Sequence, residues 1–152
     1  MSWLYIMCGV SGAGKTTFAK QYFDENIKYI SRDEIRFSLV SPEEEYFSKE
    51  TQVFKIFTNR IQKALDEGFD VVADATHLNM YSRIKLIKAL NMKGHHAAAV
   101  VVNASLATCL KHNEDRKGTR SYVPEGQIKK MFKNFKFPSV YTEPYLDSIL
   151  SV

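Results

Sequence analysis

The sequence predicts an α/β fold, a sandwich in which helices flank a small parallel sheet of about four strands. Short apolar runs alternate with longer amphipathic stretches along the 152 residues, which is typical of βαβ units. The run at residues 71–73 is apolar throughout, as expected for a strand buried on both faces of a parallel sheet. With 45% hydrophobic and 25% charged residues, the composition is that of one globular domain, and we expect a single domain over residues 1–152.

Apolar runs predict the strands, and apolar side chains spaced three and four apart predict the helices. The expected strands cover residues 3–8, 29–30, 71–73 and 97–102. The expected helices cover residues 15–23, 43–65, 81–92, 106–113 and 124–132, with a further helix opening near residue 32. The tail after Pro138 carries some apolar residues and is expected to pack along the surface of the domain.

The cysteines and the hydropathy of the chain indicate in which cellular compartment we expect the protein. Cys8 lies in an apolar run and Cys109 in a helical one, so we expect two buried thiols in a reducing environment. The first apolar stretch, residues 3–10, is too short to span a bilayer and has no basic lead or cleavage site. A cytoplasmic protein that does not bind a membrane is the expected result.

The charge is unevenly distributed. The net charge is +4, yet residues 111–136 hold eight basic and three acidic side chains, whereas residues 24–50 are predominantly acidic. The basic segment is a plausible footprint for a polyanion such as a nucleic acid, and it is equally compatible with solvated helix faces. Charge alone does not decide between these interpretations.

A phosphate-binding motif follows the first strand. Residues 9–16 read Gly-Val-Ser-Gly-Ala-Gly-Lys-Thr, the P-loop pattern, and they open a helix as that motif requires. Glycines let the backbone N–H groups face nucleotide phosphates, and the helix N-terminus adds a favourable dipole. Lys15 is expected to reach the β- and γ-phosphates of ATP, and Thr16 to offer its hydroxyl to Mg²⁺. The expected ATP contacts are Gly9, Val10, Ser11, Gly12, Ala13, Gly14, Lys15, Thr16 and Thr17.

Two charged residues follow the second strand, where ligands bind in α/β sheets. Asp33 and Arg36 are three residues apart and would share one face of a helix. Asp33 could accept the proton of an attacking hydroxyl while Arg36 holds a neighbouring phosphate. Alternatively, Asp33 caps the helix and pairs with Arg36 at the surface.

A polar segment ends the third strand. Asp74 lies where P-loop proteins often keep a carboxylate near the metal-bound water. Thr76 and Asn79 suit contact with a substrate, or a turn and a helix cap. His77 has no second ligand at metal-binding spacing, so we expect a structural or substrate-facing role.

The basic segment around Gly118 lies between two expected helices, as a mobile helical lid over phosphates would. An arginine delivered to the β–γ bridge stabilises charge on the transferring phosphoryl group. Arg116 is the first candidate for that catalytic role and Arg120 the second, and both are expected to contact ATP. The alternative is a solvated basic loop.

Taken together, residues from about 4 to about 138 resemble the kinase domain of the bacteriophage polynucleotide 5′-kinases. The similarity lies in the P-loop, in residues 30–36, in residues 76–79 with Arg83, and in residues 113–124. It implies that Asp33 is the general base and that the acceptor is contacted by Arg36, Thr76 and Arg83. Asp74, next to the same motif, is a further expected acceptor contact. The resemblance also implies Mg²⁺-dependent transfer of the ATP γ-phosphate to the 5′-hydroxyl end of DNA or RNA.

Two features depart from that family. Its third-strand motif places an aspartate directly before the threonine, whereas this chain has Ala75 there and the acid one residue earlier, at Asp74. The Asp-x-Asp-x-Thr motif of the associated phosphatase domain is absent, so we expect no 3′-phosphatase activity. A kinase of a small metabolite, such as a nucleoside or sugar, is the nearest alternative. An ATP-binding regulatory module without an acceptor is the alternative from another class.

Overall fold

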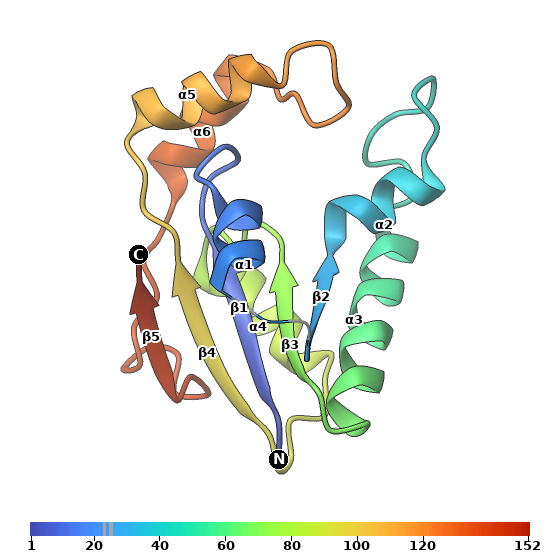
Figure 1. Cartoon of the computed structure of the whole chain (residues 1–152), viewed down its shortest axis with the longest axis vertical. Helices are drawn as coiled ribbons and strands as arrows, with labels where there is room; N and C mark the ends of the chain where they lie inside the picture. Colours follow the sequence, from blue (N-terminus) through green and yellow to red (C-terminus); the bar gives the residue numbers. More distant parts are fainter. Residues whose placement is uncertain (23, 25) are drawn as a thin grey trace.

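The computed structural model describes residues 1–22, 24 and 26–152. Their strands form one sheet in the order β2-β3-β1-β4-β5 (Figure 1). The strands are β1 (Trp3–Cys8), β2 (Ile27–Ser31), β3 (Asp70–Asp74), β4 (His96–Val101) and β5 (Ser148–Ser151). Every neighbouring pair is parallel. The carboxyl ends of the strands therefore meet at one edge, where the functional residues of such sheets gather.

Helices cover both faces of the sheet (Figure 1). They are α1 (Lys15–Tyr22), α2 (Arg32–Leu39), α3 (Glu50–Asp66), α4 (Met80–Lys88), α5 (Leu106–Asp115) and α6 (Glu125–Asn134). Side chains of β1 alternate between two clusters. Ile6 packs with α3 and α4, whereas Met7 packs with α1, α5 and α6. The α/β sandwich that the sequence predicts is confirmed.

The strand count differs from the prediction, because the tail contributes a fifth strand. β5 pairs with β4 from Ala98↔Ser148 to Val101↔Ser151 and forms an edge of the sheet. Its four residues, SILS, are half-buried or exposed. Since the strand is held through backbone pairing at an edge, its side chains carry no apolar run by which the sequence could reveal it.

The long helix also differs from the prediction, because α3 begins at Glu50 and not at residue 43. Residues 41–49 form successive turns, in which Glu44 N–H donates to Ser41 O and Ser48 N–H donates to Glu45 O. The Glu44 carboxylate also accepts from Ser41 N–H, so local contacts satisfy this segment without a helix. The predicted end of the first helix, Phe23, lies outside the described residues.

The core holds both thiols. Cys8 and Cys109 are free and fully buried, as predicted, one in each cluster. Burial raises the pKa of the Cys8 thiol to about 12, so this side chain behaves as a small apolar group. No helix in the described ranges has the length and apolar character needed to cross a membrane.

Candidate active site

The loop between β1 and α1 adopts a conformation that only glycine permits easily. Gly12 has φ of +85° and Gly14 has φ of +100°, both in the left-handed region. A Cβ atom on Gly12 would lie 2.5 Å from the backbone oxygen of Cys109 in α5. The loop therefore approaches α5 too closely for any side chain at position 12.

The inner surface of this loop offers unpaired donors. Across residues 1–22, 24 and 26–152, no hydrogen bond uses the N–H groups of Gly12, Gly14 or Lys15. The space beside the Gly14 Cα is open, with nothing within 4 Å of a Cβ built there. Free amides at a helix N-terminus attract anions, and this cradle fits the phosphates of a nucleotide.

Lys15 folds back over the same loop. Its Nζ donates to Gly9 O at 3.0 Å and to Val10 O at 3.2 Å. Burial lowers the pKa of Lys15, the carboxylates of Asp74 and Asp33 oppose that shift, and the charge of Arg116 adds to it. The predicted residues Asp33, Asp74 and Arg116 thus lie within electrostatic range of this ammonium group.

Thr16 and Asp74 meet where α1 faces the end of β3. Thr16 Oγ1 donates to Asp74 Oδ2 at 3.0 Å, and the Tyr29 hydroxyl donates to the same carboxylate oxygen. Desolvation, with the negative charge of Asp74 next, raises the pKa of Tyr29. Although the acid stands one residue earlier than in the phage family, its carboxylate points toward the P-loop.

These groups suit Mg²⁺. No group of three or more His, Cys, Asp or Glu side chains within the described residues could hold a metal by itself. Mg²⁺ is usually bound through one or two protein oxygens, several waters and substrate phosphates. A threonine hydroxyl and a buried carboxylate beside a phosphate cradle match that donor set.

Asp33 stands at the start of α2, where Ser31 and not Asp33 provides the N-cap. Its side chain is 61% exposed. Asp33 Oδ1 accepts from Arg36 at 2.5 Å and from the Tyr46 hydroxyl at 3.0 Å. One carboxylate oxygen is therefore held in place while the group as a whole faces solvent.

Arg36 differs from the expectation that it holds an acceptor phosphate. Its side chain is only 7% exposed, and Nε and Nη2 donate to the two carboxylate oxygens of Glu50 at 2.9 and 2.6 Å. Nη1 donates to Asp33 and Tyr46. Because its donors are committed to protein groups, this arginine orients Asp33 and does not present a free fork to a ligand.

The two candidate arginines of the lid occupy different places. Arg116 is half-buried, ends α5, and its side chain has no hydrogen bond or ion pair within the part of the chain described. Arg120 instead donates to Phe37 O at 3.1 Å and to Val40 O, and its guanidinium lies 4.7 Å from the centre of the Phe37 ring. The predicted contact between Arg120 and ATP does not fit this position, because the guanidinium donates its hydrogen bonds to the C-terminal end of α2.

Arg83 and Thr76 are also placed differently from an acceptor site. Arg83 is fully buried and forms an ion pair with Glu143, with Nε at 2.7 Å from Oε1. Its Nη1 donates to His77 O at 2.8 Å. The expected acceptor contact of Arg83 is therefore wrong, since solvent does not reach it. Thr76 supplies its carbonyl oxygen to Gly9 N–H at 2.9 Å, and its side chain is half-buried.

Four residues at the site were not singled out from the sequence: Tyr29, Tyr46, Glu50 and His112. The first three hold Asp74, Asp33 and Arg36 respectively. His112 Nδ1 lies 2.6 Å from Gly12 O and connects α5 to the P-loop. Of these four, only Tyr29 could have been found from the sequence, because it lies in the expected strand that precedes Asp33.

The comparisons with known proteins agree with this geometry. A family model described as an AAA domain, a P-loop family, matches residues 4–138. The chain belongs to this family. The matched range holds the P-loop, strands β1 to β4 and helices α1 to α6, whereas β5 lies beyond it. Proteins that share one fold can act on different substrates, so membership of this family does not identify the acceptor of the phosphoryl group.

One relative of this chain is named as a polynucleotide kinase. This chain is 29% identical over 145 residues to a protein of Autographa californica nuclear polyhedrosis virus that is named as a bifunctional polynucleotide kinase/RNA ligase. That match covers 87% of this chain and 20% of the viral protein, so the chain spans about a fifth of that relative. The predicted resemblance to polynucleotide kinases is confirmed by this relative.

Two solved structures share the fold. A chain of the Pnkp1/Rnl/Hen1 RNA repair complex superposes with a TM-score of 0.74 at 23% identity, over 96% of this chain and 46% of that one. A sugar kinase from Janibacter gives a TM-score of 0.64 at 15% identity, over 99% of this chain and 85% of that one. At these identities the two matches show that the fold is shared.

Proposed function

We propose that this AAA domain transfers the γ-phosphate of ATP, with Mg²⁺, to the 5′-hydroxyl end of a polynucleotide. The observation that carries the proposal is the position of Asp33, an exposed carboxylate fixed by two neighbours and within electrostatic range of the P-loop lysine. A carboxylate that follows β2, at the sheet edge that also carries the P-loop, suits a reaction in which an acceptor hydroxyl loses its proton.

Each residue has a part in this proposal. The loop amides and Lys15 hold the β- and γ-phosphates, and Asp33 accepts the proton of the attacking hydroxyl. Thr16 and Asp74 would hold Mg²⁺ directly or through water, and the bound ion would neutralise charge on the phosphates. Arg116, whose charge already acts on Lys15, stabilises negative charge on the transferring group. Thr76 remains a candidate contact for the acceptor.

A polynucleotide acceptor is supported by the viral relative and by the basic lid region. α6 exposes Lys129, Lys130 and Lys133, and only Lys129 has an ion pair among them in the described chain, to Glu125 at 3.0 Å. Unpaired lysines on one helix favour contact with a nucleic-acid backbone. A small neutral acceptor would make no use of them.

The experiment is transfer of label from γ-labelled ATP, with Mg²⁺, to a panel of acceptors. The panel holds 5′-hydroxyl RNA and DNA, the same RNA with a 5′-phosphate, nucleosides and simple sugars. We expect label on the 5′-hydroxyl oligonucleotides, none on the 5′-phosphorylated one, and none with Lys15→Ala. Label on nucleosides or sugars alone would favour a metabolite kinase. ATP hydrolysis without any labelled product would favour a regulatory module.

A further inference from the structure

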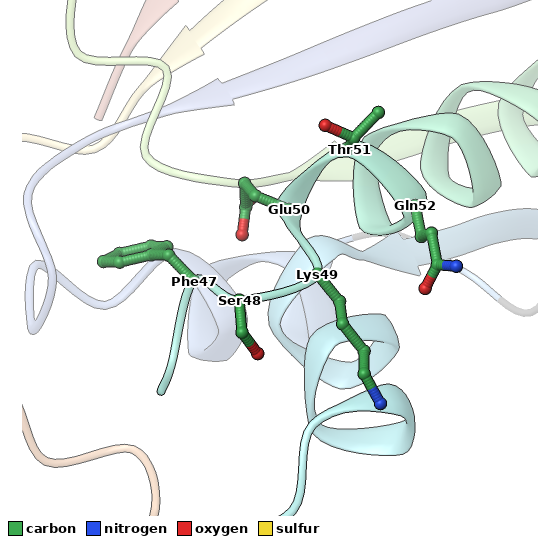
Figure 2. A pocket seen from close by; sticks show the side chains of 6 residues that line it. All are labelled: Phe47, Ser48, Lys49, Glu50, Thr51 and Gln52. Carbon is green, nitrogen blue, oxygen red and sulfur yellow. The ribbon is translucent and has the colours of Figure 1, made fainter. Parts of the chain in front are cut away.

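An open pocket of about 410 Å³ lies where α3 begins, and one of its lining residues, Glu50, pairs with the arginine that contacts Asp33. Its lining residues are Phe47, Ser48, Lys49, Glu50, Thr51 and Gln52 (Figure 2). The side chains of Phe47 and Lys49 point away from one another in this view, so the ring and the ammonium group lie on different sides of the segment (Figure 2). The volume is within the range of pockets that hold small organic groups.

Phe47 is exposed and yet held in place by its neighbours. Phe47 as a whole is 60% exposed to solvent. The Tyr46 ring meets it edge to face, with ring centres 4.7 Å apart and planes at 89°. The Arg36 guanidinium lies 5.3 Å from the centre of the Phe47 ring. Because Glu50 fixes Arg36, the phenyl ring rests on a rigid support while much of it faces solvent.

The ring is linked to the proposed catalytic carboxylate. Tyr46, whose ring packs against Phe47, donates through its hydroxyl to Asp33 Oδ1 at 3.0 Å. Phe47 is therefore one aromatic contact and one hydrogen bond away from Asp33. A group that stacks on Phe47 would therefore be connected through Tyr46 to the carboxylate that we propose as the proton acceptor.

The lining of the pocket favours an uncharged planar occupant. Glu50 contributes a carboxylate, and its two arginine partners hold its pKa below the usual range against the effect of burial, so it stays ionised. The preceding residues 43–45 are three exposed glutamates. Lys49 also lines the pocket, and its ammonium group donates to Leu39 O and pairs with Glu44. The remaining lining groups, an aromatic ring, two hydroxyls and an amide, suit a heterocycle with hydrogen-bonding edges.

We propose that Phe47 is the stacking platform for the base of the first nucleotide of the acceptor. This inference rests on the proposed function and specifies how that site selects its substrate. The pocket takes the base, and the phosphate backbone leads away from the acidic segment. Since a base must leave its own stack to lie on Phe47, single-stranded or frayed ends are preferred over blunt duplex ends.

The experiment measures transfer kinetics for two 5′-hydroxyl oligonucleotides, one natural and one with an abasic first nucleotide. Base–aromatic stacking corresponds to a factor of roughly 5 to 150 in binding. We expect Phe47→Leu to raise the KM for the natural oligonucleotide by that factor, with the KM for ATP unchanged. Phe47→Trp should retain the wild-type KM, because tryptophan also offers an aromatic face.

The abasic oligonucleotide separates stacking from a structural effect. We expect it to be equally poor for the wild type and for Phe47→Leu, since the group that stacks is missing. Tyr141→Leu is the matched control, because Tyr141 is 94% exposed and precedes β5, the sheet edge opposite to β2. It should behave as the wild type with both oligonucleotides.

Three results would overturn the proposal. Phe47→Leu could match the wild type on the natural oligonucleotide, which would exclude stacking and leave the proposed function intact. A fall in kcat of equal size with both oligonucleotides would show that Phe47 only supports Tyr46 and Asp33. Failure of the wild type to label any oligonucleotide would instead refute the proposed function, and the stacking role with it.

Discussion

Arg83 and Glu143, sixty residues apart in the chain, form an ion pair with both side chains 1% exposed. Nε and Nη2 of the arginine donate to the two carboxylate oxygens at 2.7 and 3.0 Å, and the Tyr145 hydroxyl donates to Oε1 at 2.5 Å. Together with the bond from Arg83 to His77 O, the pair fastens the segment before β5 to the loop after β3. It is part of the scaffold that supports the P-loop edge of the sheet.

Removing one member of this pair should therefore reduce stability. We expect Glu143→Gln to lower the free energy of unfolding by about 3 to 5 kcal/mol, because it leaves the guanidinium buried without its countercharge. Urea unfolding at pH 7 measures this, and the double variant Arg83→Met/Glu143→Leu should recover much of the loss. An unchanged midpoint for Glu143→Gln, with a raised KM for the acceptor, would restore Arg83 to the acceptor site.

His77 should make stability depend on pH. The ring is buried, its Nδ1–H donates to Met7 O at 2.7 Å, and burial lowers the pKa of His77 to about 4. Between about pH 6.5 and 4 the unfolded chain binds a proton that the folded chain does not, so the free energy of unfolding falls as the pH falls. From pH 7 to pH 5 the expected loss from this group is about 2 kcal/mol.

The matched variant is His77→Asn. Asparagine tolerates the positive φ of 43° at this position and can place an N–H near Met7 O. Its free energy of unfolding should change less with pH over the interval from 7 to 5, whatever its absolute stability. Urea unfolding of both proteins at the two pH values supplies the comparison. Parallel losses in the two proteins would rule out His77 as the titrating group.

Arg120 should restrain the loop between α5 and α6. Its contacts with Phe37 and Val40 join that loop to the C-terminal end of α2. We expect Arg120→Gln to speed amide hydrogen exchange in residues 116–123 by about fivefold, which corresponds to roughly 1 kcal/mol of opening free energy. Lys117→Gln is the control, since its ion pair with Glu114 lies within the same loop region. Equal exchange in both variants would mean that Arg120 does not hold the loop.

Thr16 should determine how much Mg²⁺ the reaction needs. Thr16→Val has a similar shape but loses the hydroxyl that donates to Asp74, and we expect the Mg²⁺ concentration for half-maximal transfer to rise about 10- to 100-fold. Thr16→Ser restores a hydroxyl and should restore most of the Mg²⁺ response. The measurement is a Mg²⁺ titration of label transfer. A normal titration curve for Thr16→Val would remove Thr16 from the metal site.

The sequence predicted those parts of the fold that local patterns encode. The P-loop and the buried strand β1 combine a residue motif with apolar periodicity, and both were found where expected. β5 was missed because an edge strand is defined by backbone pairing with β4. The start of α3 was misplaced because residues 41–49 satisfy their hydrogen bonds in turns.

For the site, the sequence identified charged residues but not their partners. The sequence predicts acceptor contacts for Arg36 and Arg83, whereas the structure gives each a carboxylate partner, Glu50 and Glu143 respectively. Such pairing depends on which distant segments the fold brings together, and spacing along the chain does not contain that information. Asp33 was picked out from its position after β2, whereas Tyr46, which orients it, lies in a turn without a motif.

The most direct test of the proposed reaction is the rate of label transfer to a 5′-hydroxyl oligonucleotide by Asp33→Asn, with ATP and oligonucleotide both saturating. Asparagine preserves the shape of the side chain but accepts a proton far less readily. We predict that kcat falls by roughly two to four orders of magnitude while ATP binding is retained. Glu34→Gln, the neighbouring exposed acid, should keep normal turnover. Near-normal turnover of Asp33→Asn would contradict the assignment of Asp33 as the general base.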